Sequence, residues 1–348
     1  MKYKLKDVCN FYSGTGFPTK YQGEIEGDYP FYKVGDITNN VIAGNIYLEM
    51  CNNYVSIDTV KKIKGCVLPP NTVVFAKIGE ALKLNRRAIT SCACLIDNNA
   101  MGIAPKEDTL RIQYFYFFMK NLKMQVLAES TTVPSVRKTI LEDYEVEIPS
   151  LNIQEEIESR LTIIQDIIEK RKKELSLLDN LIKARFVEMF GNPRLNEKGF
   201  KCKKGFELFK ISNGKAVSNE KRFESGIPAY GGNGISWYTN TVLFEEDTIV
   251  IGRVGFQSGN VHFVKGPMWI TYNAMYISEL YDDSLSLVFL CDMMEQIDFT
   301  RDQDAGDLKK VTQKPFMEME YILPEKSLQK EYIDFVHQVD KSKFMKSF

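Results

Sequence analysis

The chain has 348 residues and a formal net charge of −1, and 44% of its residues are hydrophobic. These values are typical of a globular protein with two domains of about 150 residues each. No run approaches the roughly 18–20 apolar residues of a membrane span, and the charged N-terminus predicts no secretory signal. Seven irregularly spaced cysteines favour a reducing cytoplasm over a disulfide framework. A net charge near zero argues against a strongly basic nucleic-acid binder, although local patches set the field at a groove.

Residues 1–150 are predicted to form a first domain of mixed strands and helices. The β-branched segments 72–76 and 88–90 are bounded by turn formers and predict strands. The aromatic run from Gln113 to Val126 predicts a buried helix. Gly14-Thr15-Gly16 lacks the remaining spacing of a phosphate-binding loop, so we expect a turn that can bring backbone near a ligand.

Residues 151–191 are predicted to form a long helix, because the segment from Gln154 to Phe190 contains neither glycine nor proline. Apolar residues recur there in alternating steps of four and three, and the pattern continues in phase through Arg171 and Arg185, which indicates a coiled-coil-like seam. At 1.5 Å per residue the helix is about 55 Å long, and Gly191-Asn192-Pro193 ends it. The predicted seam consists of Ile157, Leu161, Ile164, Ile168, Leu175, Leu178, Ile182 and Met189.

Residues 192–325 are predicted to form a second domain that repeats the first about 175 residues later. The three pairs that carry the repeat are Asn71-Thr72-Val73-Val74 with Asp247-Thr248-Ile249-Val250, Asn99-Ala100-Met101 with Asn273-Ala274-Met275, and Ile148-Pro149 followed by Gln154 with Leu323-Pro324 followed by Gln329. The three motifs recur in the same order and at nearly the same sequence distance. This indicates a duplicated domain, since solenoid repeats are only about 20–50 residues long. Thr72 and Thr248 should therefore lie on equivalent strands, and Asn99 and Asn273 at equivalent positions. A helix is expected from Leu285 to Ile297.

Residues 326–348 are predicted to form a short helix that pairs antiparallel with the long one. About 20 helical residues span about 30 Å, so this helix should cover the seam from Met189 back to about Ile168. Ile157, Leu161 and Ile164 would then lack an intramolecular helical partner, and a modification subunit, a second copy or a further tail is expected to cover them. The apolar residues of the short helix are Tyr332, Phe335, Val336 and Val339.

The sequence lacks the groupings of the common catalytic and metal sites. Its two histidines, His262 and His337, stand far apart, and Cys92-Ala93-Cys94 has no matching pair to complete a zinc site. No Asn-Pro-Pro-aromatic motif of an amino-methyltransferase and no Ser-His-Asp grouping is present. We therefore expect a binding protein that is not an enzyme and holds no metal.

Three regions resemble the specificity (S) subunits of type I restriction–modification systems. They are the opening, with Leu5-Lys6-Asp7-Val8 and Phe31-Tyr32-Lys33-Val34-Gly35-Asp36-Ile37, the central helix, with Gln154-Glu155-Glu156-Ile157 and Leu181-Ile182-Lys183-Ala184-Arg185-Phe186, and the tail, Val339-Asp340-Lys341-Ser342-Lys343-Phe344. The resemblance covers the whole chain. It implies an α+β fold in which two similar target recognition domains, each a twisted β-sheet with helices, are separated by long antiparallel coiled-coil-like helices.

The same resemblance implies that each domain reads one half of a bipartite, asymmetric site in the major groove of double-stranded DNA. The helices would act as a ruler that fixes the gap, and about 55 Å corresponds to roughly one and a half turns of B-DNA. Two modification subunits would methylate adenine with S-adenosylmethionine, and restriction subunits would use ATP and Mg²⁺ to move and cleave DNA. The chain itself would bind no cofactor.

The tail departs from this family, whose members usually continue into a second long helix. Either the chain is truncated or its ruler is unequal. Two alternatives stay open: an S fragment, truncated or phase-variable, that needs a second chain, and a coiled-coil scaffold whose two paralogous domains bind partners other than DNA. An independent enzyme ranks below both.

Arginine and lysine are the side chains expected to contact guanine bases and phosphates. Lys77 and Arg253 occupy equivalent positions of the repeat, which favours both. Trp237, after the turn Gly231-Gly232-Asn233-Gly234, is a candidate for packing on a sugar or a thymine methyl group. About a third of the cations are expected to contact DNA. The candidates are Lys20, Lys33, Lys77, Lys83, Arg86, Arg87, Arg137 and Lys138 in the first domain, and Lys215, Arg222, Arg253, Lys309 and Lys310 in the second.

Overall fold

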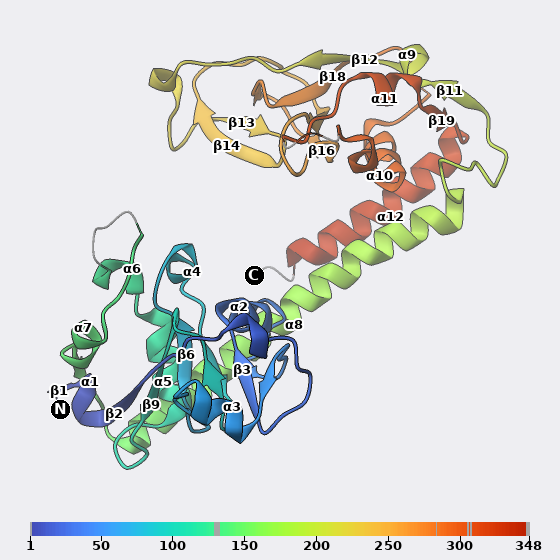
Figure 1. Ribbon diagram of the computed structural model, residues 1–348. Coiled ribbons are helices and arrows are strands. Elements are labelled where there is room, and N and C mark those ends of the chain that lie inside the picture. The colour runs from blue at the N-terminus through green and yellow to red at the C-terminus, as the bar shows by residue number, and fades with distance from the viewer. Residues whose placement is uncertain (1, 129–132, 283, 305, 307, 346–348) are drawn as a thin grey trace. The chain divides into compact units, whose positions relative to one another are not determined.

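The structure, a computed structural model, describes the chain apart from residues 1, 129–132, 283, 305, 307 and 346–348. The chain divides into two compact units, residues 1–169 (unit 1) and 170–348 (unit 2). A continuous helix, α8 (Leu151–Phe190), begins in unit 1 and ends in unit 2 (Figure 1). No helix of the described residues is both long and apolar enough to cross a membrane.

Unit 1 is built on a five-stranded sheet with the order β2–β9–β6–β7–β4, in which β4 runs parallel to β7 and the other neighbours are antiparallel. Along β6, Val73 and Phe75 belong to one buried cluster and Val74 to another, as the two-residue period of a strand requires. The sheet therefore has a core on both faces. Its strands are β2 (Cys9–Ser13), β4 (Tyr47–Leu48), β6 (Val73–Ala76), β7 (Ala88–Thr90) and β9 (Ala100–Pro105).

A smaller three-stranded sheet and several short helices complete unit 1. The sheet has the order β5–β3–β8, with β3 (Tyr29–Tyr32), β5 (Tyr54–Val55) and β8 (Leu95–Ile96), and β1 (Lys2–Lys4) pairs separately with β10 (Glu145–Glu147). The helices are α1 (Leu5–Val8), η1 (Thr19–Tyr21), α2 (Val34–Ile42), α3 (Ile57–Lys62), α4 (Glu80–Lys83), α5 (Ile112–Asn121), α6 (Met124–Leu127) and α7 (Lys138–Glu142).

The single helix predicted from Gln113 to Val126 is wrong, because α5 and α6 are separated by extended backbone at Leu122. The side chain of Asn85 holds this break. Its amide nitrogen donates to the carbonyl of Lys120 (2.9 Å), and its oxygen accepts from the backbone N–H of Met124 (3.4 Å). Backbone groups that a continuous helix would pair internally thus find a partner outside it.

Unit 2 repeats this architecture with a four-stranded sheet of order β12–β18–β15–β16 and a three-stranded sheet of order β14–β13–β17. The strands are β11 (Cys202–Lys204), β12 (Phe209–Asn213), β13 (Ile227–Gly231), β14 (Gly234–Thr239), β15 (Thr248–Gly252), β16 (Val261–Val264), β17 (Trp269–Ile270), β18 (Ala274–Leu280) and β19 (Glu320–Ile322). The helices are α9 (Gly205–Leu208), η2 (Asn219–Lys221), α10 (Leu287–Ile297), η3 (Phe299–Asp302), α11 (Lys314–Glu318) and α12 (Lys326–Met345).

The registers of the two sheets confirm that the halves are copies of one fold. Met101 lies opposite Ser13 and Phe75 in unit 1, and Met275 lies opposite Asn213 and Ile251 in unit 2. The backbone N–H of Lys77 donates to the carbonyl of Asn99 (2.8 Å), just as that of Arg253 donates to the carbonyl of Asn273 (2.9 Å). The predicted equivalences of Thr72 with Thr248 and of Asn99 with Asn273 therefore hold in register, although Thr72 directly precedes β6 whereas Thr248 is the first residue of β15.

A buried glutamine attaches each long helix to its unit in the same way. In unit 1 the side-chain oxygen of Gln154 accepts from the backbone N–H of Arg111 (2.9 Å), and its nitrogen donates to the carbonyls of Thr109 and Pro149 (both 2.9 Å). In unit 2 Gln329 accepts from the N–H of Ser286 (3.1 Å) and donates to the carbonyls of Ser284 and Pro324 (both 2.9 Å). The repeated Pro-to-Gln spacing in the sequence is the trace of this glutamine contact, although its role was not predicted.

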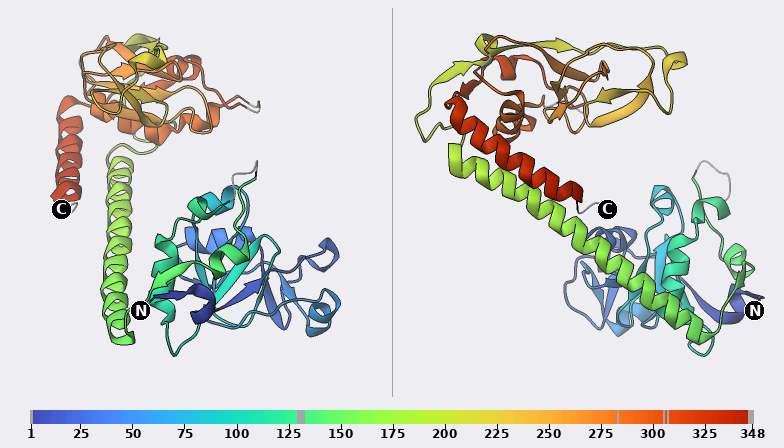
Figure 2. Two further views of the ribbon diagram at one scale, coloured as in Figure 1. Left: turned by 90° about the vertical axis from the view of Figure 1, so that its left-hand side faces the viewer. Right: turned by 180° about the vertical axis from the view of Figure 1, so that it is seen from behind.

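Within unit 2, α12 lies antiparallel beside the second half of α8, as Figure 1 and Figure 2 show. Arg185 pairs with Glu331 (2.9 Å) and Lys343 with Asp179 (2.8 Å). Tyr332, Val336 and Val339 are buried, as predicted, and Phe335 is half-buried beneath the Arg185 guanidinium, 5.7 Å from its ring. The predicted helix pair is therefore present.

The predicted extent of this pair is wrong. Lys343, which lies beside Asp179, is only two residues from the last residue of α12, and Leu175 and Ile168 are 39% and 48% exposed. The first turn of α12 is used to attach the helix to its own unit, through Gln329, so less of its length faces α8. Leu178, Ile182, Met189, Ile157 and Leu161 are half-buried, and Ile164 is exposed. The absence of a helical partner for Ile157, Leu161 and Ile164 stays a prediction.

The heptad pattern also missed the two most buried hydrophobic residues of α8. Phe186 and Phe190 are fully buried among Phe289 and Tyr332, with ring centroids 4.8–5.5 Å apart. The end of α8 thus packs into the core of unit 2 as well as onto α12. An aromatic pair four residues apart on one helix face is the signal that was available for this in the sequence.

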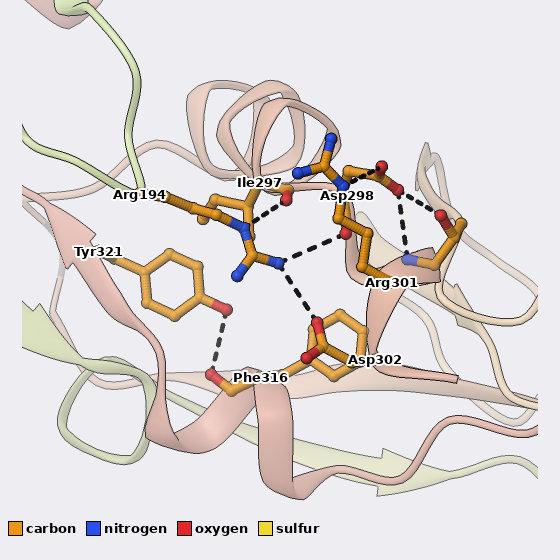
Figure 3. A network of polar contacts seen from close by, with 8 residues as sticks. Arg194, Ile297, Asp298, Arg301, Asp302, Phe316 and Tyr321 are labelled. Carbon is orange, nitrogen blue, oxygen red and sulfur yellow. Dashed lines mark hydrogen bonds and ion pairs between the residues drawn. The ribbon is translucent and has the colours of Figure 1, made fainter. Parts of the chain in front are cut away.

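Beyond α8, Arg194 secures the chain to the end of α10 (Figure 3). Its Nε donates to the carbonyl of Ile297 (2.7 Å), and its guanidinium pairs with Asp302 (3.3 Å). α10 is followed by Asp298, which has a left-handed backbone (φ 60°) and whose carboxylate accepts from the N–H of Thr300 (3.3 Å). Arg194 therefore supplies a cation and donors where helix carbonyls lack partners.

Candidate nucleic-acid interface

The equivalent cations Lys77 and Arg253 stand at the same end of the two main sheets. Lys77 follows the last residue of β6, beside the first residue of β9, and Arg253 follows β15 beside the first residue of β18. The carbonyls of Lys77 and Arg253 accept from the N–H groups of Val136 (2.9 Å) and Val311 (3.0 Å). Backbone bonds on both sides thus fix where each cation leaves the sheet. Lys77 is half-buried and Arg253 is exposed.

The glycines near these sheet ends are required by the chain itself. A Cβ atom at Gly14 would lie 1.7 Å from the carbonyl oxygen of Asp97, and one at Gly214 would lie 2.1 Å from that of Thr271. Gly232 also lies close to Gly252, since its Cβ would meet the Cα of Gly252 at 2.9 Å. These turns pack two sheets together, which explains the glycines without a ligand.

Most of the other predicted cations of unit 1 lie on the loops and short helices that follow β2, β3 and β6. Lys20 sits over the ring of Tyr21 (4.8 Å), and Lys33 donates to the side chain of Gln22 (3.0 Å). Lys83 pairs with Glu80 (2.6 Å) and Lys138 with Glu142 (3.4 Å). Exposed ion pairs of this kind contribute little to stability, so these ammonium groups can exchange partners. Arg86 is half-buried and Arg137 is exposed.

The prediction that Arg87 contacts DNA is wrong. Only 1% of this residue is exposed, and its guanidinium lies over the ring of Phe75 (4.8 Å). It donates to the carbonyl of Arg86 (2.8 Å) and to the side chain of Asn85 (2.6 Å). Burial lowers the pKa of Arg87 to about 10. This arginine therefore supports the core of unit 1 and is not available to DNA.

In unit 2 the predicted residues form two groups. Lys309 and Lys310 lie against the loop after Arg253, since the N–H of Gly255 donates to the carbonyl of Lys309 (2.8 Å). Arg222 lies over the ring of Trp237 (5.1 Å) on the smaller sheet, so Trp237 is half-buried and partnered within the chain. Lys215 is exposed, and its carbonyl accepts from the indole of Trp269 (3.1 Å).

This arrangement offers positive charge and hydrogen-bond donors on irregular segments held by a sheet, which suits a phosphate backbone and base edges. Among the described residues, no group of three or more histidine, cysteine, aspartate or glutamate side chains is placed to hold a metal ion.

Comparison with known proteins agrees with the duplication. A family model described as the type I restriction modification DNA specificity domain matches residues 1–177 and again residues 197–346. The type I restriction enzyme MjaIX specificity subunit of Methanocaldococcus jannaschii is 23% identical over 244 residues, which cover 64% of this chain and 54% of the relative. The EcoprrI specificity subunit of Escherichia coli is 25% identical over 305 residues, 79% of this chain and 71% of the relative. The chain thus spans about half the length of the first relative.

Two solved structures share the fold. The S subunit of a type I restriction–modification system from M. genitalium aligns with a TM-score of 0.59 and 16% identity, covering 100% of this chain and 91% of the other. A chain from a structure on complex assembly and conformational transition of the type I R-M system aligns with a TM-score of 0.53 and 14% identity, covering 100% of this chain and 92% of the other. Because the family model matches both halves of the chain, the chain belongs to the type I restriction–modification DNA specificity family.

Proposed function

We propose that the chain is the DNA-recognition subunit of a type I restriction–modification complex, in which each unit reads one half of a bipartite site. The observation that carries this proposal is the repetition of one fold with a cation at the same sheet end, Lys77 in unit 1 and Arg253 in unit 2. A single chain with two non-identical reading units specifies an asymmetric site, whereas a symmetric dimer specifies a palindrome.

The long helix is the proposed ruler between the half-sites. α8 has 40 residues and is therefore about 60 Å long. The chain is proposed to act as a scaffold without catalysis: two modification subunits would supply adenine methylation with S-adenosylmethionine, and restriction subunits would supply ATP- and Mg²⁺-dependent cleavage. The membership of the chain in the specificity family supports this division of labour.

The salt dependence of DNA binding tests the proposal, since each phosphate contact releases counterions. The complex of the chain with its cognate modification subunit is titrated with duplex DNA at several salt concentrations. Lys77→Ala and Arg253→Ala should each reduce the slope of log K against log salt by about one if the cation contacts a phosphate.

Lys106→Ala is the matched control, because Lys106 follows the opposite end of β9, where it donates to the carbonyl of Asp7 (2.8 Å). The slope of log K against log salt for Lys106→Ala should equal that of the wild-type complex. DNA binding that is absent, or that does not depend on salt, would favour a protein scaffold instead.

A further inference from the structure

The loop after β15 presents one phenylalanine almost entirely to solvent. Phe256 is 90% exposed, more than any other large hydrophobic residue in the described part of unit 2. Exposed aromatic side chains of this size are uncommon unless they contact a partner. The question is therefore what Phe256 contacts.

The loop that carries Phe256 is held rigidly by backbone hydrogen bonds. The N–H groups of Gly252 and Gly259 donate across its base to the carbonyls of Asn260 and Gly252 (both 2.8 Å), and that of Ser258 donates to the carbonyl of Gly255 (3.0 Å). The side chain of Gln303 donates to the carbonyls of Phe256 (3.0 Å) and Ser258 (2.7 Å). The exposure of Phe256 is thus built into the loop.

Positively charged residues lie on the loop of Phe256 and on the segment that is paired with it. Arg253 begins the loop, and the segment paired with it carries Lys309 and Lys310, through the hydrogen bond of Gly255 to Lys309 and the bridge of Val254 with Lys310. Leu308, also exposed, adds apolar surface beside them. The same stretch of sequence carries Asp302, Asp304 and Asp307, of which Asp302 pairs with Arg194 (3.3 Å), so the three cations outnumber the two other aspartates. A ring flanked by cations suits a nucleic acid, whose bases stack on aromatic faces while its phosphates attract the charges.

The described residues of unit 1 do not repeat this arrangement at the corresponding place. The N–H of Gly79 donates to the carbonyl of Pro134 (2.8 Å), as that of Gly255 does to Lys309, so Glu80 corresponds to Phe256. Pro134 and Ser135 stand where unit 2 has its two lysines, and Glu80 pairs with Lys83. At this place, therefore, the two copies present different side chains on equivalent backbone.

From this contrast we propose that Phe256 inserts into the stacked bases of the half-site read by unit 2, while unit 1 reads its half-site without such an insertion. The proposal rests on the proposed DNA-recognition function. Arg253, Lys309 and Lys310 hold the phosphates beside the opened step, and the deformability of that step contributes to the choice of sequence.

The test uses the complex with the cognate modification subunit and duplexes of its mapped site that carry 2-aminopurine at successive positions. At positions other than the adenines that the modification subunits flip out for methylation, binding should raise the fluorescence at one step of the unit 2 half-site and at none of the unit 1 half-site. Phe256→Ala should abolish this rise and weaken binding about tenfold or more, without changing the salt slope, because no charge is removed. Phe256→Trp should retain the rise.

Phe206→Ala is the control, since Phe206 is 53% exposed but precedes β12 at the opposite end of the sheet from Gly252. It should leave affinity and fluorescence unchanged. If the wild-type complex binds DNA without a rise in 2-aminopurine fluorescence, the insertion of Phe256 is refuted and the DNA-recognition function stands. A Phe256→Ala chain that fails to assemble with the modification subunit assigns the ring to a protein contact and also overturns it. Loss of DNA binding by the unchanged complex would instead refute the proposed function.

Discussion

Replacing Gln329 with methionine should destabilise unit 2 by about 3 kcal/mol. The substitution keeps the length of the side chain and its helix propensity, but it removes the hydrogen bonds to the N–H of Ser286 and to the carbonyls of Ser284 and Pro324. Gln329 is buried, so these partners lose their bonds without gaining water. At a net value of about 1 kcal/mol each, three lost bonds give the stated loss.

Hydrogen exchange measures this loss unit by unit, which a single unfolding curve of a two-unit chain does not. Amides of α10 should exchange about a hundredfold faster in the Gln329→Met chain, while those of α5 in unit 1 keep their rates. Gln154→Met should give the reverse pattern, because Gln154 makes the same three bonds in unit 1.

Lys330→Met is the matched control, since it places the same side chain at an exposed neighbouring position of α12. It should leave both units unchanged. A loss below about 1 kcal/mol for Gln329→Met, or an equal loss in both units, would refute the view that these glutamines attach the helices to their own units.

Three further predictions concern charge, the core and the ruler. Burial raises the pKa of Asp292 to about 6, above its usual 3.8, so its contribution to the stability of unit 2 should fall as pH rises from about 4 to 6. Asp292→Asn can still accept from the hydroxyl of Tyr332 but does not titrate. The loss of stability between pH 4 and 6 should therefore be smaller in this variant than in the wild-type chain. Arg87→Met should alter the hydrogen exchange of unit 1 and leave the salt slope of DNA binding as it was, because the guanidinium is buried over Phe75; a reduced slope would mean that Arg87 reaches DNA. Seven residues inserted after Glu174, within α8, should change the gap in the methylated site and keep both half-sites, whereas an altered half-site sequence would contradict the ruler.

The sequence predicted the duplicated architecture because a repeat leaves matching motifs at one offset. It also predicted the helices α8 and α12, because the spacing of apolar residues along a helix is a local property of the chain. Side-chain environments that depend on distant segments were not predictable in the same way. Arg86-Arg87 looks like a solvated basic pair, yet the ring of Phe75 buries its second member. The heptad pattern placed Arg185 on the seam, whereas the adjacent Phe186 is the residue that enters the core of unit 2.

The repeat also limited what could be predicted for the candidate site. It identified Lys77 and Arg253 as equivalent, which the hydrogen bonds to Asn99 and Asn273 confirm as a structural relation. It gave no reason to single out Phe256, since that residue matters through its exposure and its difference from Glu80. Features that distinguish two copies become visible only after the copies have been aligned in space.

A genome-wide map of N6-methyladenine in cells that express the chain with its cognate modification subunit tests the central claim most directly. Two non-identical reading units on one chain predict a bipartite, asymmetric motif with a fixed gap of unspecified bases. Exchanging residues 192–325 for the corresponding segment of another family member should then replace one half of the motif and keep the other. A single continuous motif, a palindrome, or a change in both halves would contradict the account.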